Sequence, residues 1–155
     1  MKIKKIILVI MSIMLVFSLA SCGIIENILK LGKDEISFNK ILNNLEEIVT
    51  DDIELSVEEG EDDGRSLLSE CFDYEVEEAY KGTIKNSLYC ENEGDGEWWC
   101  IVAFECGSED EAKQLMDLIS TLFYDSDWEN IQLVVEGNVL LVATNEKIID
   151  TALGK

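Results

Sequence analysis

The residues best suited to chemistry in this 155-residue chain are its cysteines, because the sequence contains no histidine. The absence of histidine excludes the Ser/His and Cys/His nucleophile arrangements and the usual zinc-bound water site. Four cysteines follow the first 22 residues, at Cys71, Cys90, Cys100 and Cys106. Their spacing contains neither the C-x-x-C motif of a thioredoxin-like redox centre nor the short knuckle with which a zinc site usually begins. The pattern therefore favours a structural role.

Outside the cytosol, four such cysteines would form two disulfides. If the apolar run that holds Cys100 and Cys106 is an extended strand, these two residues lie about 20 Å apart, which is beyond disulfide reach. A hairpin turn would place Cys90 opposite Cys100 and leave Cys106 to meet Cys71 on a helix beneath. We expect these two disulfides, and four reduced core cysteines are the alternative.

Acidic side chains outnumber basic ones 33 to 12, and two acidic segments partly match a calcium-binding loop. In the first, glutamate replaces aspartate at two early positions of the pattern D-x-[DN]-x-[DN]-G-x5-E, and in the second asparagine stands where glycine is usual. Neither is an EF-hand, but Ca²⁺ is the one candidate cofactor. The candidate ligands are Glu59, Glu61, Asp63 and Glu70 in the first segment and Asp125, Asp127, Glu129 and Glu136 in the second.

The first 22 residues have the order of a secretory signal. Three lysines in Met1–Lys5 precede an apolar run, Ile6–Phe17, of about a dozen residues, which is shorter than the roughly 20 that a membrane-spanning helix needs. The next motif, Leu19-Ala20-Ser21-Cys22, resembles the bacterial lipobox. This resemblance implies cleavage before Cys22 and a diacylglyceryl group on its sulfur. We therefore expect a lipoprotein signal peptide over residues 1–21 and a lipid anchor that holds the mature protein on the extracytoplasmic face of the cell membrane.

The mature chain, residues 22–155, is long enough for one domain with one core. Removal of the signal leaves nine basic and 33 acidic residues, a net charge of −24. We predict a tether over 22–35 and a single acidic domain over 36–155, with a solvated acidic loop at 50–65. The charge favours a cationic protein or peptide as partner. It disfavours nucleic acid, because phosphate binding requires clustered lysine and arginine.

Apolar periodicity predicts the elements that must position these residues. Helical spacing indicates helices over 34–49, 68–80 and 108–123, the last opened by a Ser108/Glu111 capping box, and a short final helix capped by Asn145. Alternating or continuous apolar residues indicate strands over 83–90, 98–106, 131–136 and 139–144, the last two joined at Gly137-Asn138. The order α-α-β-β-α-β-β-α predicts an α+β domain with a four-stranded, mostly antiparallel sheet covered by helices.

Two details of the predicted strands bear on a site. Alternation places Ile84, Leu88 and Cys90 on one face of the strand 83–90. Adjacent Trp98 and Trp99 point to opposite faces of the next strand, and we expect both to pack in the core. The alternative is an exposed tryptophan beside the turn at 91–96, which would suit a carbohydrate or protein contact.

Several features together resemble small lipoproteins of Gram-positive bacteria whose domain has no assigned activity. They are the lipobox, an N-terminal helix, the tyrosine-bearing segment Tyr74–Tyr80, the strand-to-helix join Val102–Leu115 and the terminal hairpin Val134–Val142. The resemblance covers most of the mature chain. It implies the location and the fold class, and it carries over no catalytic residue.

These patterns lead to one expected function and two alternatives. We expect a lipid-anchored extracytoplasmic protein of the bacterial envelope that acts as a non-enzymatic binding or interaction domain. The first alternative is an envelope enzyme that uses a pair of carboxylates as acid and base, although so many acids make no pair distinctive. The second is a calcium-dependent structural or adhesive lipoprotein.

Overall fold

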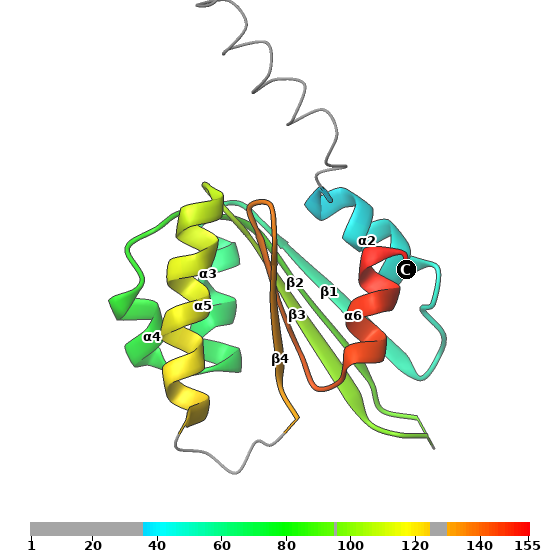
Figure 1. Ribbon diagram of the computed structural model, residues 1–155. Coiled ribbons are helices and arrows are strands. Elements are labelled where there is room, and N and C mark those ends of the chain that lie inside the picture. The colour runs from blue at the N-terminus through cyan, green and yellow to red at the C-terminus, as the bar shows by residue number, and fades with distance from the viewer. Residues whose placement is uncertain (1–35, 95, 125–129) are drawn as a thin grey trace, which may run out of the picture. The chain divides into compact units, whose positions relative to one another are not determined.

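The described part of the chain, residues 36–94, 96–124 and 130–155 of a computed structural model, is built on a five-stranded sheet (Figure 1). All neighbouring strands are antiparallel, in the order β1-β2-β3-β5-β4. The central strand β3 is buried on both faces, as its apolar sequence predicted. The strands are β1 (Ile53–Glu59), β2 (Ile84–Asn92), β3 (Trp99–Cys106), β4 (Gln132–Glu136) and β5 (Val139–Ala143).

Helices cover both faces of this sheet and produce three layers (Figure 1). One face packs against α2 (Phe38–Glu46) and α6 (Glu146–Leu153), and the other against α3 (Glu61–Cys71), α4 (Tyr74–Ala79) and α5 (Glu109–Tyr124). The sheet therefore separates two apolar cores. The α+β class is confirmed, whereas the predicted count of four strands and the predicted element order are wrong. No helix in these described ranges is long and apolar enough to cross a membrane.

Strand β1 lies where the sequence predicted a solvated acidic loop at 50–65. Ile53, Leu55 and Val57 alternate toward the α2 layer, while the side chains between them are exposed. Strand β1 is an edge strand, so its outward face can carry acids without burying them. The acidic composition of the segment thus concealed an ordinary period-two pattern. Helix α3 follows directly after Gly60, whose φ of 108° makes the turn.

The predicted helix over 68–80 is two helices, separated at Phe72 and Asp73. The Asp73 side chain accepts a hydrogen bond from the backbone N–H of Glu75 and caps α4. Arg65 of α3 donates hydrogen bonds to the backbone carbonyls of Glu77, Tyr80 and Gly82 and lies over the Tyr80 ring. One side chain therefore satisfies carbonyls at the C-terminal end of α4 and in the segment that follows it.

A bulge in β2 changes which side chains share a face. Ile84 pairs with Cys106 and Asn86 with Glu105, so one extra residue lies between the two positions of β2. An extra residue reverses the alternation of a strand. Ile84 consequently packs in the α3/α5 core, whereas Leu88 and Cys90 pack in the α2/α6 core. The prediction that all three share one face is wrong for Ile84.

The predicted capping box of α5, the β4–β5 hairpin turn and the Asn145 cap of α6 are all confirmed. At the start of α5 the Glu111 N–H donates to the Ser108 hydroxyl, and the Glu111 carboxylate accepts from the backbone N–H of Gly107. The β4–β5 turn places Gly137 at φ 58°, which suits the first position of a two-residue hairpin turn. Asn145 caps α6 by accepting from the Ile148 N–H.

Candidate functional site

A pocket of about 630 Å³ opens on the α3/α5 face of the sheet. This volume falls within the range of small-molecule sites. Its floor is formed by β3 and β5, and its walls by the C-terminal ends of α3 and α5. The lining residues are Ser56, Leu67, Glu70, Cys71, Phe72, Asp73, Tyr89, Trp98, Cys100, Val102, Leu122, Phe123, Ile131, Val142, Ala143 and Thr144.

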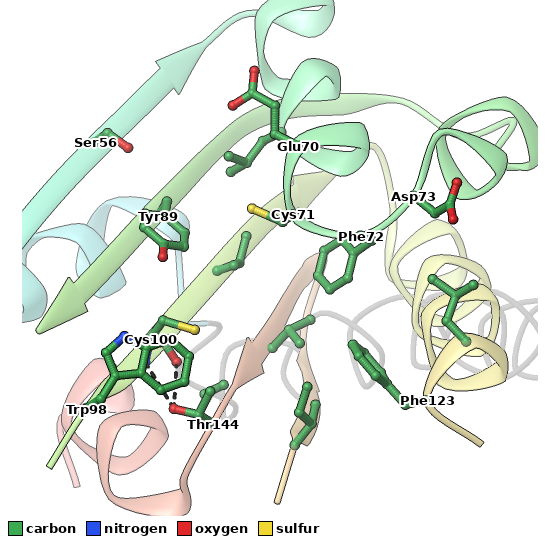
Figure 2. A pocket seen from close by; sticks show the side chains of 16 residues that line it. Ser56, Glu70, Cys71, Phe72, Asp73, Tyr89, Trp98, Cys100, Phe123 and Thr144 are labelled. Carbon is green, nitrogen blue, oxygen red and sulfur yellow. Dashed lines mark hydrogen bonds between the residues drawn. The ribbon is translucent and has the colours of Figure 1, made fainter. Parts of the chain in front are cut away.

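The floor of the pocket is held by an extension of the β3–β5 pairing. Beyond the last residue of β5, the Thr144 N–H donates to the Cys100 carbonyl at 3.1 Å, and the Thr144 hydroxyl oxygen accepts from the Cys100 N–H at 3.0 Å (Figure 2). The threonine side chain thus supplies the acceptor that another strand residue would provide. This interaction fixes the Cys100 backbone at the edge of the pocket.

Two thiols, Cys71 of α3 and Cys100 of β3, line the pocket and face its interior (Figure 2). Burial, together with the neighbouring Cys100, Glu70 and Glu91, raises the pKa of Cys71 to about 12. Burial and the Glu91 carboxylate also raise the pKa of Cys100. The nucleophilic form of cysteine is the thiolate. Both side chains are therefore neutral, weakly reactive groups at neutral pH.

One end of the pocket is aromatic and acidic. Tyr89 donates a hydrogen bond from its hydroxyl to Glu91 Oε2 at 2.7 Å. Burial raises the pKa of Tyr89, and the hydrogen bond to Glu91 raises it further. Figure 2 shows Tyr89, Trp98 and Cys100 at this end and Phe72 and Phe123 at the other. The pocket thus has a polar end and an apolar end.

Trp98 stands at the polar end with 51% of its surface exposed, while Trp99 packs partly buried against the α2/α6 core. The prediction that both tryptophans pack in the core is wrong for Trp98. Its side chain lies just before β3 and beside the β2–β3 turn. The alternative of an exposed tryptophan beside this turn is the arrangement observed.

The four domain cysteines are free thiols in the structure. In the register between β2 and β3, Cys90 pairs with Ile101 and Glu91 pairs with Cys100. This register is shifted by one position from the expected pairing of Cys90 with Cys100. Cys90 is buried in the α2/α6 core, whereas Cys100 lines the pocket on the opposite face of the sheet, so the two side chains do not face each other in this structure. Cys106 is buried in the α3/α5 core, where its sulfur neighbours the Tyr80 hydroxyl. Sequence reasoning did not anticipate that Cys71 and Cys100 share a pocket.

The structure does not form a calcium loop from the first acidic segment. Glu59 ends β1, and Glu61, Asp63 and Glu70 belong to α3, whose backbone cannot wrap around an ion as a loop does. Glu70 lies at the rim of the pocket. Within the described ranges, no three His, Cys, Asp or Glu side chains cluster closely enough to hold a metal.

Most of the remaining predicted site residues lie outside the described part of the chain. Asp125, Asp127 and Glu129 of the second acidic segment lie outside the described residues, as does Cys22. Glu136 ends β4, where its carboxylate lies 3.9 Å from the Lys155 ammonium.

Sequence patterns missed most of the pocket because its residues come from six separate elements and neighbouring loops. The apolar members, such as Val102 and Leu122, follow the periodicity of ordinary core residues. Only Trp98, adjacent to an acidic and glycine-rich turn, carried a signal of exposure. Comparison with protein families, curated proteins and solved structures finds no match to this chain.

Proposed function

We propose that this protein is a lipid-anchored extracytoplasmic binding domain that holds a small, largely apolar molecule in the α3/α5 pocket. The observation that carries the proposal is the pocket itself, with a ligand-sized volume of about 630 Å³ and an apolar floor and walls. Sites of this kind bury most of a small ligand and orient it with a few polar groups. Here those groups are Tyr89, Thr144 and the rim carboxylates.

Binding rather than reaction is the role that suits these side chains. The Cys71 and Cys100 thiols keep their protons because burial raises both pKa values. A protonated thiol contributes polarizable apolar surface to a ligand rather than a nucleophile. We therefore assign the two thiols to the lining of the binding site.

The location is supported by the lipobox-like sequence Leu19-Ala20-Ser21-Cys22 and the basic and apolar segments before it. Replacement of Cys22 by alanine should prevent lipid attachment, so the product should no longer partition into detergent. Mass spectrometry of the purified wild-type protein should show the diacylglyceryl mass on Cys22. An unmodified Cys22 would overturn the lipid anchor and leave the pocket proposal intact.

Pocket occupancy can be tested with N-phenyl-1-naphthylamine, an uncharged fluorescent probe of apolar sites. The Cys100→Phe variant places a ring in the pocket and should weaken binding by at least about tenfold, through lost contact area. Ser56→Phe adds a ring at the exposed β1 margin and should weaken binding without changing the core. Lys147→Phe adds the same ring to the exposed surface of α6 and serves as the control. Equal probe binding by all these variants would contradict the proposal.

A further inference from the structure

The two ends of the pocket differ in chemistry, and the difference selects a class of ligand. At the apolar end, Phe72, Leu122, Phe123 and Ile131 provide hydrocarbon and ring surface. At the polar end, Tyr89 and half-exposed Trp98 present aromatic rings. The pocket is therefore amphipathic along its length, and its occupant should have an apolar body and one polar head.

Carboxylates lie beside the polar end. Glu91 lies directly opposite Glu54 on β1 and directly opposite Cys100 on β3. Directly opposed strand residues have their Cβ atoms about 5 Å apart, a separation at which like charges repel. Glu70 adds a carboxylate at the rim, whereas Asp73 lies beside Phe72, away from the polar end (Figure 2).

No lysine or arginine forms an ion pair with these carboxylates in the described ranges. The ion pairs found there join Lys113 to Glu109 on α5 and Lys155 to Glu136 at the end of β4. The whole chain carries a net charge of −21. A cleft lined by one sign of charge concentrates ligands of the opposite sign. An anionic head would be repelled here, and an uncharged head would leave the repulsion between Glu54 and Glu91 in place.

Aromatic rings favour the same kind of head. A cation placed over the face of a tryptophan or tyrosine ring is attracted by the ring quadrupole, and substituted ammonium groups are well suited to such contacts. Tyr89 also fixes Glu91 through its hydroxyl. Rings and carboxylates therefore lie together at one end of an apolar cavity.

We propose that the pocket binds an amphipathic organic cation, with its ammonium head between Trp98, Tyr89 and Glu91 and its hydrocarbon body toward Phe72 and Phe123. This assignment rests on the proposed function, since it names the ligand class of the same pocket. The occupant is a small molecule, because the pocket volume of about 630 Å³ falls within the range of small-molecule sites.

The test compares three ligands that share an eight-carbon chain: octyltrimethylammonium, octanol and octanoate. Isothermal titration calorimetry should show the cation binding about tenfold more tightly than the alcohol, the equivalent of one good cation–aromatic and charge contact, and octanoate binding most weakly. Glu91→Gln should remove most of the preference for the cation while octanol affinity stays the same. Asp150→Asn removes an equal charge from exposed α6 on the other face and should leave the preference unchanged.

The outcomes separate the two proposals. Equal affinity for octyltrimethylammonium and octanol would overturn the cation assignment and retain an apolar binding pocket. Binding of none of the three, together with no binding of the uncharged probe, would overturn the proposed function. If Glu91→Gln and Asp150→Asn lost the preference for the cation to the same extent, the preference would come from the overall charge of the protein, and the assignment would be overturned. Displacement of the bound cation by a tetralysine peptide would overturn the proposal that the occupant is a small molecule.

Discussion

Raising the pH above 9 should destabilise the fold, because its buried thiols resist ionisation. Burial raises the pKa of Cys90 and Cys106 to about 11, whereas the ordinary value for a thiol is 9.0. Between these pH values the unfolded chain has released protons that the folded chain still holds. The stabilising contribution of the neutral thiols is therefore complete below pH 9 and is lost progressively as the pH approaches 11.

The size of the effect follows from the burial of these two side chains. Cys90 and Cys106 have no exposed surface, so the full difference in pKa applies to each. One pKa unit corresponds to about 1.4 kcal/mol, and two thiols together should lower the free energy of unfolding by about 2 to 3 kcal/mol between pH 8 and pH 10. This is a large part of the 5 to 15 kcal/mol that is typical of a domain.

The assay is urea unfolding of the domain at pH 8, 9 and 10 under reducing conditions, followed by tryptophan fluorescence. Cys90→Ala should lower the stability at pH 8, because it leaves a cavity, but should remove its own share of about 1 kcal/mol from the loss between pH 8 and 10. The matched control is Leu88→Ala, which makes a cavity in the same core and keeps both thiols. The same pH dependence in Cys90→Ala and Leu88→Ala would refute the reasoning.

Three further predictions concern α3 and its neighbours. Arg65→Ala should lower the free energy of unfolding by about 3 kcal/mol, because three carbonyls lose a charged donor, and Arg65→Lys should recover part of this in the same urea assay; equal stability of all three proteins would contradict it. Gly64→Ala should cost about 1 to 3 kcal/mol, because its Cβ would lie 3.0 Å from the Ile84 side chain at the contact between α3 and β2; an unchanged urea midpoint would show that the helix can shift freely. Alkylation of Cys71 by iodoacetamide at pH 8 should be at least about tenfold slower than that of glutathione, as measured by mass spectrometry, and a comparable rate would mean that the thiol ionises readily.

The elements with strong local signals could be predicted from the sequence. Helix α5 has a capping box and an uninterrupted apolar stripe, and the β4–β5 hairpin has a turn pair that only a few geometries accept. Strand β1 was missed because the many acids of this segment indicated a solvated loop. The alternation of apolar residues in the same segment, at Ile53, Leu55 and Val57, was given less weight. The period was present, but the partner strand that makes it meaningful lies about 30 residues later in the chain.

The pocket and the positions of the cysteines depended on register, which the sequence leaves open. A shift of one residue between β2 and β3 decides whether Cys90 and Cys100 face each other or lie on opposite faces. The bulge after Ile84 moves that side chain to the other core by the same mechanism. The pocket itself exists because the ends of α3 and α5 leave part of the sheet uncovered, which is a property of packing rather than of any segment.

The acidic outer face of β1 has a consequence for crowded conditions. A second copy could approach this free edge and continue the sheet, since an edge strand offers unpaired N–H and C=O groups. Antiparallel pairing of two β1 strands about Ser56 would place Glu54 of each copy directly opposite Glu58 of the other, twice in one short contact. Such pairing would place like charges opposite each other at both ends of the contact, and their repulsion disfavours it. Many copies held close together on one surface would therefore remain separate molecules, with the mouth of each pocket beside β1 left open.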